Sequence, residues 1–380
     1  MQSDENSKEK GTPITDMLYL GDIMTNHDRE LQMVAAVKQI LASVHPLRYL
    51  FFELTRKCNL LCAHCGSRCP GYEPGEELTA ADFKRVVDRV SQVYSPSQLM
   101  FCITGGEPLL RNDWFEICSY ISEKRYSWGM TTNGTLIDKK CVQDLARTGM
   151  KTVAVSLDGL KNEHERLRGV SGSFEQAVSG IRYLKESGSF KTVQVVTVVT
   201  RSNIAELPAL FDLVNNLGVD SWKLTAIEPM GDAVLRRDLF LAEEDYYTLF
   251  DFIKQYRRRV PLVVNYGCSH LLPEQYDDTV RSQAFLCGAG TMIASIASNG
   301  DILPCLDIDC RDLVKQGNIR NDDFVDVWEN RFDQFRANKA NISEICQECP
   351  KKQTCQGDSW HSWDFQNNQP RICFEKHIFP

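Results

Sequence analysis

Between residues 49 and 227, short apolar, β-prone runs alternate with segments whose apolar residues recur at helical spacing. Strands that alternate with helices predict a parallel sheet, and a run such as VQVVTVV indicates a strand buried on both faces. Six repeats are too few for a closed eight-stranded barrel. The sequence therefore predicts an α/β fold built on a partial (β/α)6 TIM barrel, with a doubly wound open sheet as the alternative. The six β-prone runs are residues 49–54, 99–104, 128–132, 152–157, 192–200 and 222–227.

Residues typical of helix ends lie between these runs. Thr79 followed by Asp82 predicts a helix start, as does Ser173 followed by Gln176. A glycine stands just after three of the helical stretches, where a left-handed residue is favoured: Gly149, Gly188 and Gly218. The first 25 residues are polar, and we expect them to be frayed. An amphipathic helix is then predicted from five apolar residues at helical spacing: Leu31, Val34, Ala35, Ile40 and Leu41.

Fifteen cysteines are the unusual feature of the composition. Disulfide frameworks are typical of short secreted chains with an even number of cysteines, whereas this chain has 380 residues and an odd number. Its start, MQSDENSKEK, lacks the apolar core of a signal peptide. We therefore expect a cytoplasmic protein with reduced cysteines, and reduced cysteines in such numbers point to metal binding.

Charge and hydropathy exclude several other classes. The chain has 43 Lys and Arg against 51 Asp and Glu, a net charge of −8, which argues against nucleic-acid binding and against a polybasic membrane surface. No apolar stretch approaches the roughly 18 residues that a membrane-spanning helix needs. Hydrophobic residues make up 43% and charged residues 25%, a globular balance that excludes wholesale disorder.

The alternation of strands and helices stops near residue 265, and eight of the fifteen cysteines lie between Cys268 and Cys373. Asn299-Gly300 predicts a hairpin, and residues 322–338 predict a helix. The segment has few aliphatic residues for a core of its own, which favours a metal as structural staple. We divide the chain into an N-terminal extension with a helix (1–47), a partial barrel (48–264) and a cysteine-rich domain (265–380).

Three cysteines follow the first β-prone run. The segment CNLLCAHC places Cys58, Cys62 and Cys65 at CxxxCxxC spacing. A structural zinc site closes with four ligands, so three thiolates on one loop leave a coordination position open for chemistry. Thiolates in a tight loop suit an iron–sulfur cluster, and βα barrels carry their active sites at the C-terminal ends of the strands. The alternative is three unrelated cysteines.

The second β-prone run ends in ITGGEPLL, on the same predicted edge of the sheet. Gly105 and Gly106 allow backbone atoms to approach a ligand closely. Glu107, which precedes Pro108, can accept hydrogen bonds from an ammonium group. GGEP alone is weak evidence, but one βα unit after a CxxxCxxC loop it is a strong combination.

Together these motifs resemble the radical S-adenosylmethionine (radical SAM) superfamily over residues 48–230. TTNGT (131–135), SLDG (156–159) and HERLRG (164–169) are similar to further motifs of that family, in the same order. The resemblance implies a [4Fe–4S] cluster on Cys58, Cys62 and Cys65, whose open iron is chelated by the amino and carboxylate groups of S-adenosylmethionine. One electron from the cluster would then yield a 5′-deoxyadenosyl radical that abstracts hydrogen from the substrate, while the protein orients and shelters the reactants.

The resemblance also implies a binding role for individual residues. The methionine ammonium would contact Gly105, Gly106 and Glu107, and the carboxylate would contact Arg168, whose guanidinium fork suits a carboxylate. Ser156 would contact the ribose, and His64 would lie beside the adenine. From the residues alone, Arg168 as a solvated surface residue and Ser156 bonded to its own backbone stay open as alternatives.

The C-terminal cysteines resemble the SPASM domain, which carries auxiliary [4Fe–4S] clusters, over residues 285–375. The similar features are Cys287-x12-Gly300-x4-Cys305, GNI (317–319), FVDVWEN (324–330) and CxxC-x5-C from Cys346. The family continues with a further cysteine where this chain has Ser359, a poor iron ligand. A zinc-ribbon site is the alternative. For the first auxiliary cluster we predict Cys268, Cys287, Cys305 and Cys310, and for the second Cys346, Cys349, Cys355 and Cys373.

The residues left over have a simpler interpretation. Asp307 and Asp309 beside Cys305 are either a proton acceptor or solvated acids of a loop. Buried packing is expected for the four remaining cysteines: Cys69, Cys102, Cys118 and Cys141.

Three functions stay open. The first is a radical SAM oxidoreductase that matures a ribosomally made peptide by oxidation or crosslinking, although residues 1–47 are too short for the separate peptide-recognition domain that many maturases carry. The second is a radical SAM enzyme acting on a small molecule or a cofactor precursor, a quinone or a tetrapyrrole. The third is a zinc-stabilised binding protein without redox chemistry. For the first two we expect an anaerobe's cytoplasm and a flavodoxin- or ferredoxin-type reductant.

Overall fold

A single ten-stranded sheet forms the centre of the computed structural model, which describes residues 26–69, 76–257, 261–268, 270–281, 286–308 and 310–380. The first 25 residues, expected to be frayed, lie outside the described residues. Six strands lie side by side in chain order, each parallel to the next. Sequential order is that of a barrel wall, since a doubly wound sheet reverses its strand order. The predicted partial barrel is confirmed. Its strands are β1 (Tyr49–Glu53), β2 (Met100–Thr104), β3 (Ser127–Thr132), β4 (Thr152–Ser156), β5 (Thr192–Val199) and β6 (Ser221–Ala226).

The sheet continues beyond the six predicted strands at both ends. Strand β7 (Val263–Tyr266) is parallel to β6, and β8 (Ile293–Ile296) is parallel to β1. The predicted hairpin is confirmed, because β8 pairs antiparallel with β9 (Asp301–Leu303), with Gly300 at φ 93° between them. Strand β10 (Gly317–Asn318) completes this edge. The sheet thus crosses the predicted domain boundary at residue 265, and the cysteine-rich segment is partly built onto the barrel.

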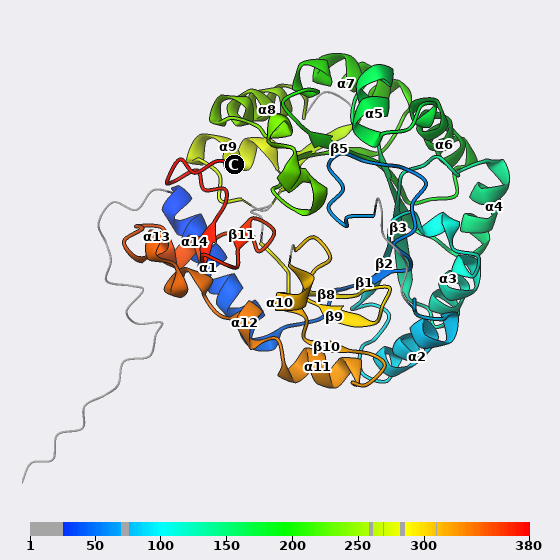
Figure 1. The fold of residues 1–380 in the computed structure, drawn as a ribbon, viewed down its shortest axis with the longest axis horizontal. Helices are drawn as coiled ribbons and strands as arrows, with labels where there is room; N and C mark the ends of the chain where they lie inside the picture. Colours follow the sequence, from blue (N-terminus) through cyan, green and yellow to red (C-terminus); the bar gives the residue numbers. More distant parts are fainter. Residues whose placement is uncertain (1–25, 70–75, 258–260, 269, 282–285, 309) are drawn as a thin grey trace, which may run out of the picture.

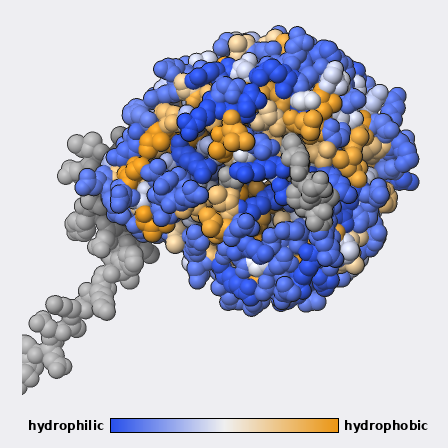
Figure 2. Space-filling view, in the orientation of Figure 1, coloured by the Kyte–Doolittle hydropathy of each residue, from blue (hydrophilic) through white to orange (hydrophobic). Residues whose placement is uncertain are grey.

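Seven helices surround the strands on the outside of the ring (Figure 1). Large apolar side chains, among them Phe52, Phe83, Phe101 and Trp128, are fully buried between sheet and helices. Hydrophilic residues cover most of the outer edge of the face seen in Figure 2, and hydrophobic residues gather nearer its middle. None of the described helices is both long and apolar enough to cross a bilayer. The seven are α2 (Ala80–Ser91), α3 (Trp114–Glu123), α4 (Lys139–Arg147), α5 (Lys161–Arg168), α6 (Ser173–Ser187), α7 (Leu207–Asn216) and α8 (Glu243–Tyr256).

Most of the predicted helix ends are confirmed. Thr79 caps α2 in a reciprocal capping box with Asp82. The prediction for Ser173 is wrong by one residue: Gly172 is the N-cap of α6, and the Ser173 hydroxyl instead donates to the carbonyl of Val170 (2.8 Å). All three predicted glycines have left-handed backbones: Gly149 at φ 80°, Gly188 at 60° and Gly218 at 68°.

The predicted N-terminal helix is α1 (Asn26–Val44), and it packs against the C-terminal region. Leu31 is buried, but Ile40 is 58% exposed, so the predicted apolar face is wrong at that residue. The Lys38 ammonium donates to the carbonyls of Thr354 (3.2 Å) and Cys355 (2.9 Å) at the end of α14 (Lys352–Cys355). The helix therefore covers the cysteine-rich segment, as Figure 1 also shows.

Aromatic residues build the core of the C-terminal region. The predicted helix over 322–338 is wrong: the chain forms α11 (Phe324–Asn330) and α12 (Asp333–Arg336), because Phe332 between them turns into the core. Its ring lies 5.1 Å from Trp328, and Phe335 lies 4.8 Å from Trp360. The remaining elements are short: α9 (Glu274–Val280), α10 (Arg311–Val314), α13 (Glu344–Gln347), β11 (Trp363–Asp364) and β12 (Gln369–Pro370).

Candidate active site

The loop with Cys58, Cys62 and Cys65 lies at the C-terminal end of β1, and all three cysteines are half-buried. The Leu61 N–H donates to the carbonyl of Arg168 at the end of α5 (3.0 Å). The Ala63 N–H, two residues further along the loop, donates to the carbonyl of Leu167 (2.8 Å). The loop is therefore attached to the fourth βα unit as well as to the first.

Each of the three sulfurs accepts a hydrogen bond from an N–H group, and the donors come from different segments. Such donors stabilise the thiolate, which is the form that binds iron. The pairs are Asn133 Nδ2 to Cys58 Sγ (3.9 Å), Arg168 Nη1 to Cys62 Sγ (3.6 Å) and the backbone N–H of Cys69 to Cys65 Sγ (3.3 Å).

The three thiols differ in acidity. Burial raises the pKa of Cys58, and it raises the pKa of Cys62 to about 11 although Arg168 opposes this. A hydrogen bond from the Cys69 thiol lowers the pKa of Cys65 to about 6, against the effect of burial. Cys69 is buried, as predicted, but it also lies against the cluster loop, a contact that its position four residues after Cys65 could have indicated.

The two glycines of GGEP are required by the cluster loop itself. A Cβ on Gly105 would lie 2.4 Å from the carbonyl oxygen of Thr55, and one on Gly106 would lie 2.3 Å from that of Lys57. The Gly106 N–H donates to Thr55 (2.7 Å). Any side chain at these positions would push the cysteine loop away from β2. The predicted close approach to a ligand stays a prediction.

Glu107 ties the same segment to the end of β3. Its buried carboxylate accepts hydrogen bonds from the Thr132 hydroxyl (2.9 Å), the Asn133 N–H (2.8 Å) and the Leu109 N–H (3.2 Å). Burial raises its pKa to about 7, although these bonds favour the ionised form. Asn133 in turn donates to Cys58, so Glu107 helps to position a donor to the cluster loop.

A buried ion network that the sequence did not assign lies at the end of β4. Asp158 is fully buried, with Arg168 Nη2 2.6 Å and His64 Nε2 3.1 Å from its carboxylate. Burial works against the charge, yet Arg168 and His64 hold the pKa of Asp158 well below its usual range. The Asp158 N–H donates to His164 Nδ1 (3.1 Å), and burial lowers the pKa of that histidine to about 4.

This network answers one alternative left open by the sequence. Arg168 is nearly buried, with its side chain 12% exposed, and is not a solvated surface residue. Its Nε is buried without a hydrogen-bond partner among the described residues, which leaves one donor for an anionic group. Ser156 is the last residue of β4, on the same edge of the sheet. Asp158, His164 and Asn133 belong to the SLDG, HERLRG and TTNGT motifs, and that membership was the available signal for them.

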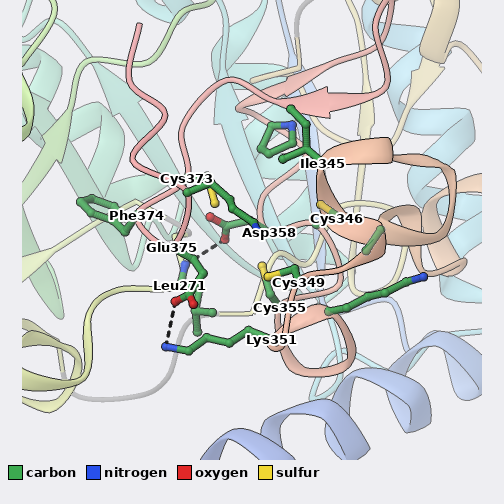
Figure 3. A pocket seen from close by; sticks show the side chains of 15 residues that line it. Leu271, Ile345, Cys346, Cys349, Lys351, Cys355, Asp358, Cys373, Phe374 and Glu375 are labelled. Atoms are coloured by element: carbon green, nitrogen blue, oxygen red, sulfur yellow. Dashed lines mark hydrogen bonds and ion pairs between the residues drawn. The ribbon is translucent and has the colours of Figure 1, made fainter.

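Four cysteines of the C-terminal region line one pocket. They come from α13, α14 and the segments after them, and their sulfurs turn toward the same space (Figure 3). The pocket wall is mostly apolar, with Leu271, Ile345 and Phe374 beside the thiols. The donor chemistry fits an iron–sulfur cluster. The four are the predicted second auxiliary set: Cys346, Cys349, Cys355 and Cys373.

The four thiols of the predicted first auxiliary set lie in different surroundings. Cys305 Sγ lies 3.8 Å from His361 Nε2, and Asp307 belongs to the same group of possible ligands. Burial raises the pKa of Cys305 well above its usual value, and the negative charge of the Cys287 thiolate raises it further. Cys268 lies beside Glu228 and His270, and Cys310 is the left-handed N-cap of α10, at φ 62°. Asp309 lies outside the described residues.

Two further observations concern Ser359 and the cysteines left over from the predicted clusters. Ser359 is buried, and its hydroxyl accepts the N–H of His361 (3.1 Å), so the serine fixes the histidine that faces Cys305. Cys118 in α3 is buried as predicted, whereas Cys102 in β2 and Cys141 in α4 are half-buried. Burial raises the pKa of all three thiols.

An open α/β barrel that gathers three thiols at its C-terminal edge, followed by a cysteine-rich domain, defines an enzyme with metal-cluster cofactors. The chain belongs to the radical SAM superfamily, whose family pattern matches residues 52–214, and the SPASM iron–sulfur cluster-binding domain matches residues 287–350. These two domains imply that the chain binds S-adenosylmethionine and iron–sulfur clusters. The family also excludes the alternative of a binding protein without redox chemistry.

Relatives of known activity cover most of the chain. The AdoMet-dependent heme synthase of Nitratidesulfovibrio vulgaris is 27% identical over 331 residues, 82% of this chain and 86% of that protein. Mycofactocin maturase MftC of Mycobacterium tuberculosis is 29% identical over 312 residues, 81% of this chain and 77% of that protein. Among solved structures, Streptococcus suis SuiB has the same fold, with a TM-score of 0.65 at 21% identity over 90% of this chain and 81% of that chain.

Proposed function

We propose that this enzyme modifies a ribosomally made peptide by oxidation or crosslinking. The observation that carries the proposal is the match to mycofactocin maturase, which extends over barrel and C-terminal domain alike. PqqA peptide cyclase of Granulibacter bethesdensis supports it, at 23% identity over 82% of this chain. The arrangement of residues at the barrel edge gives such an enzyme its radical chemistry.

In this proposal Cys58, Cys62 and Cys65 hold the [4Fe–4S] cluster. When bound, the cluster and S-adenosylmethionine supply a 5′-deoxyadenosyl radical that abstracts hydrogen from the substrate. The chain's own residues orient these groups. Arg168, held by Asp158, offers its free Nε–H to the methionine carboxylate. Its neighbours at the sheet edge bind the rest of the molecule: Gly105, Gly106 and Glu107 the ammonium, Ser156 the ribose and His64 the adenine.

In the C-terminal domain, we assign Cys346, Cys349, Cys355 and Cys373 to one auxiliary cluster, supported by the pocket that they share. Cys287 and Cys305 belong to another. A flavodoxin- or ferredoxin-type protein in the cytoplasm supplies the electron.

A second candidate substrate is an iron porphyrin. Heme synthases from three organisms match this chain at 27–28% identity over 82–84% of its length. The Fe-coproporphyrin III synthase of Methanosarcina barkeri is 34% identical over 43% of this chain.

The test uses the cluster-loaded enzyme under anaerobic conditions with S-adenosylmethionine and a reductant. One sample receives a short peptide encoded beside the gene, and another receives Fe-coproporphyrin III. We expect 5′-deoxyadenosine together with loss of hydrogen from the peptide, measured by mass spectrometry. Conversion of the porphyrin with an unchanged peptide would establish the second candidate. Absence of 5′-deoxyadenosine in every sample would contradict the radical chemistry itself.

A further inference from the structure

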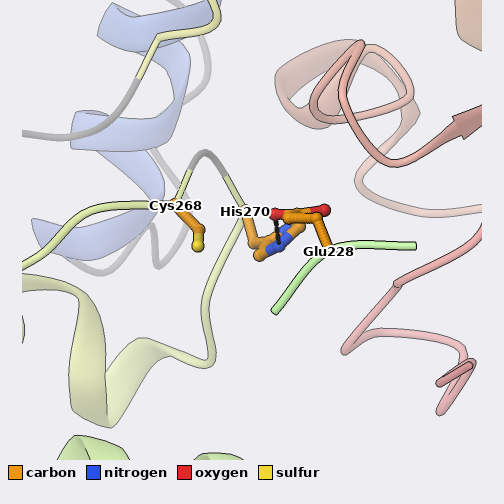
Figure 4. Close-up of side chains that lie close together, drawn as sticks. All are labelled: Glu228, Cys268 and His270. Atoms are coloured by element: carbon orange, nitrogen blue, oxygen red, sulfur yellow. Dashed lines mark ion pairs between the residues drawn. The ribbon is translucent and has the colours of Figure 1, made fainter. Parts of the chain in front are cut away.

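Glu228, Cys268 and His270 form a group of possible metal ligands that includes only one thiol of the predicted cluster sets, Cys268. Glu228 follows β6, and the other two residues follow β7, so all three lie at the C-terminal edge of the barrel (Figure 4). One ligand atom from each residue lies within 4.8 Å of the other two. The side chain of Glu228 is 9% exposed, that of His270 is fully buried, and Cys268 is 5% exposed.

The polar atoms of this group face one another, and Glu228 Oε2 is buried without a hydrogen-bond partner among the described residues. Glu228 Oε1 and His270 Nε2 form a buried ion pair at 2.9 Å, and the Cys268 thiol donates to the carbonyl of Ala226 (3.5 Å). Leaving a buried carboxylate oxygen unpaired is costly. One cation between the three side chains would satisfy these atoms together.

The spacing suits one ion better than a cluster. Zinc binds sulfur at about 2.3 Å and nitrogen or oxygen at about 2.0–2.2 Å, which places neighbouring ligand atoms within about 4 Å of one another. A [4Fe–4S] cluster binds each thiolate on a different iron and spreads its ligands farther apart. The donors here are one sulfur, one nitrogen and one oxygen, a mixed set that suits a borderline divalent ion such as Zn²⁺.

A carboxylate already orients the histidine as metal sites require. Asp358 Oδ2 lies 3.3 Å from His270 Nδ1, and its other oxygen accepts the N–H of Leu271 (2.9 Å). A carboxylate on one ring nitrogen fixes the imidazole so that the other nitrogen faces the metal. Asp358 belongs to the C-terminal domain, three residues after Cys355, so the group connects that domain to the barrel edge.

We propose that Glu228, Cys268 and His270 bind one Zn²⁺ ion, with Asp358 as positioning residue and a fourth coordination position left open. Three protein ligands with an open position are the pattern of reactive zinc sites. Cys268 is thereby assigned to this ion and not to the first auxiliary cluster. The ion fixes the segment around Asp358, and with it the end of the second cluster pocket, against β6 and β7.

The first test is made on the wild-type enzyme, purified anaerobically, loaded with its clusters, supplied with Zn²⁺ and passed over a weak chelator. We expect one zinc per chain with the full iron and sulfide content. Zinc-edge X-ray absorption should show one sulfur at about 2.3 Å and two or more nitrogen or oxygen neighbours near 2.0–2.2 Å. Absence of zinc, or zinc surrounded by sulfur alone, overturns the proposal. Loss of iron in the same samples would instead speak against the proposed function, so the two failures are distinguishable.

Variants give an independent test on the same preparation. Glu228→Gln and Cys268→Ser should lose the zinc while iron stays at the wild-type value, and Asp358→Asn should weaken zinc binding by about 10–100-fold. Glu243→Gln is the matched control, because Glu243 also pairs with a histidine, His377 (2.7 Å), but on the surface. Should Cys268→Ser lose iron and sulfide in place of zinc, Cys268 is a cluster ligand and the proposal is wrong.

Discussion

The cysteine loop of the barrel and the cysteine pocket of the C-terminal domain hold their thiols in different ways. The loop with Cys58, Cys62 and Cys65 is attached to β1 and α5, and each sulfur receives an N–H donor. The pocket with Cys346 and Cys355 is built on helices of four residues each. Helices that short have little stability of their own, so their geometry depends on packing and on the groups they bind.

This difference indicates two kinds of dependence on iron. The barrel site is preorganised by a sheet whose strands bury one face in a large apolar core. Along β5 buried residues alternate with half-buried ones, so the expectation of burial on both faces is wrong. The C-terminal pocket rests on an aromatic cluster and on α1, whose Lys38 reaches the carbonyl of Cys355. We therefore expect the barrel to keep its structure without clusters and the pocket to lose much of its structure.

The largest effect is expected from removing thiols of the barrel loop. Cys62→Ala combined with Cys65→Ala should abolish formation of 5′-deoxyadenosine, because one thiol cannot hold the cluster. The product is measured by liquid chromatography after anaerobic reaction. Cys102→Ala with Cys118→Ala removes two thiols that lie in β2 and α3, and this control should keep the activity. Any residual cleavage in the first variant would contradict the assignment of the loop.

The comparison itself is tested by removing iron from the wild-type protein. After treatment with a strong chelator, amide hydrogen exchange should rise steeply over residues 344–358 and stay low in β1–β6. Hydrogen exchange with mass spectrometry measures both regions in one sample. A uniform rise over the whole chain would show that the barrel depends on the clusters as much as the pocket does.

The sequence predicted what local patterns determine and missed what distant pairing determines. The β-prone runs, the cysteine loop and the Gly300 turn are each encoded within a few residues, and all were located from the sequence. Strand β7 has four residues and is defined only by its pairing with β6. The Glu228 group joins residues that follow β6 and β7, and His64 reaches Asp158 from the end of β1, so no local spacing reveals these contacts.

An intermediate effect is expected from the Asp158 network. Asp158→Asn removes the charge that holds Arg168 and His64, so the free Nε of Arg168 should lose its position. The affinity for S-adenosylmethionine, measured by calorimetry on the cluster-loaded protein, should fall by about 10–100-fold. Asp144→Asn is the matched control, because the nearly buried Asp144 also pairs with basic side chains, Lys140 and Arg147, but on α4 and outside the site. Equal losses in both variants would mean that the network has no special role.

The smallest effect concerns the capping box that begins α2. The Thr79 hydroxyl accepts the N–H of Asp82 (3.3 Å), and the Asp82 carboxylate accepts the N–H of Thr79 (2.9 Å). Thr79→Ala should lower the free energy of unfolding by about 1 kcal/mol, measured in urea, and Thr79→Ser should restore most of it.

The same variant separates the two regions, because α2 touches the C-terminal domain through Arg89 and Asp323 (2.7 Å). An exposed ion pair of this kind transmits little energy, about 0–1 kcal/mol. Thr79→Ala should therefore leave the iron content and the hydrogen exchange of the cysteine pocket unchanged. A loss of pocket protection as large as the loss in the barrel would show that the two regions unfold as one unit, and the distinction between a preorganised site and an iron-dependent site would then be wrong.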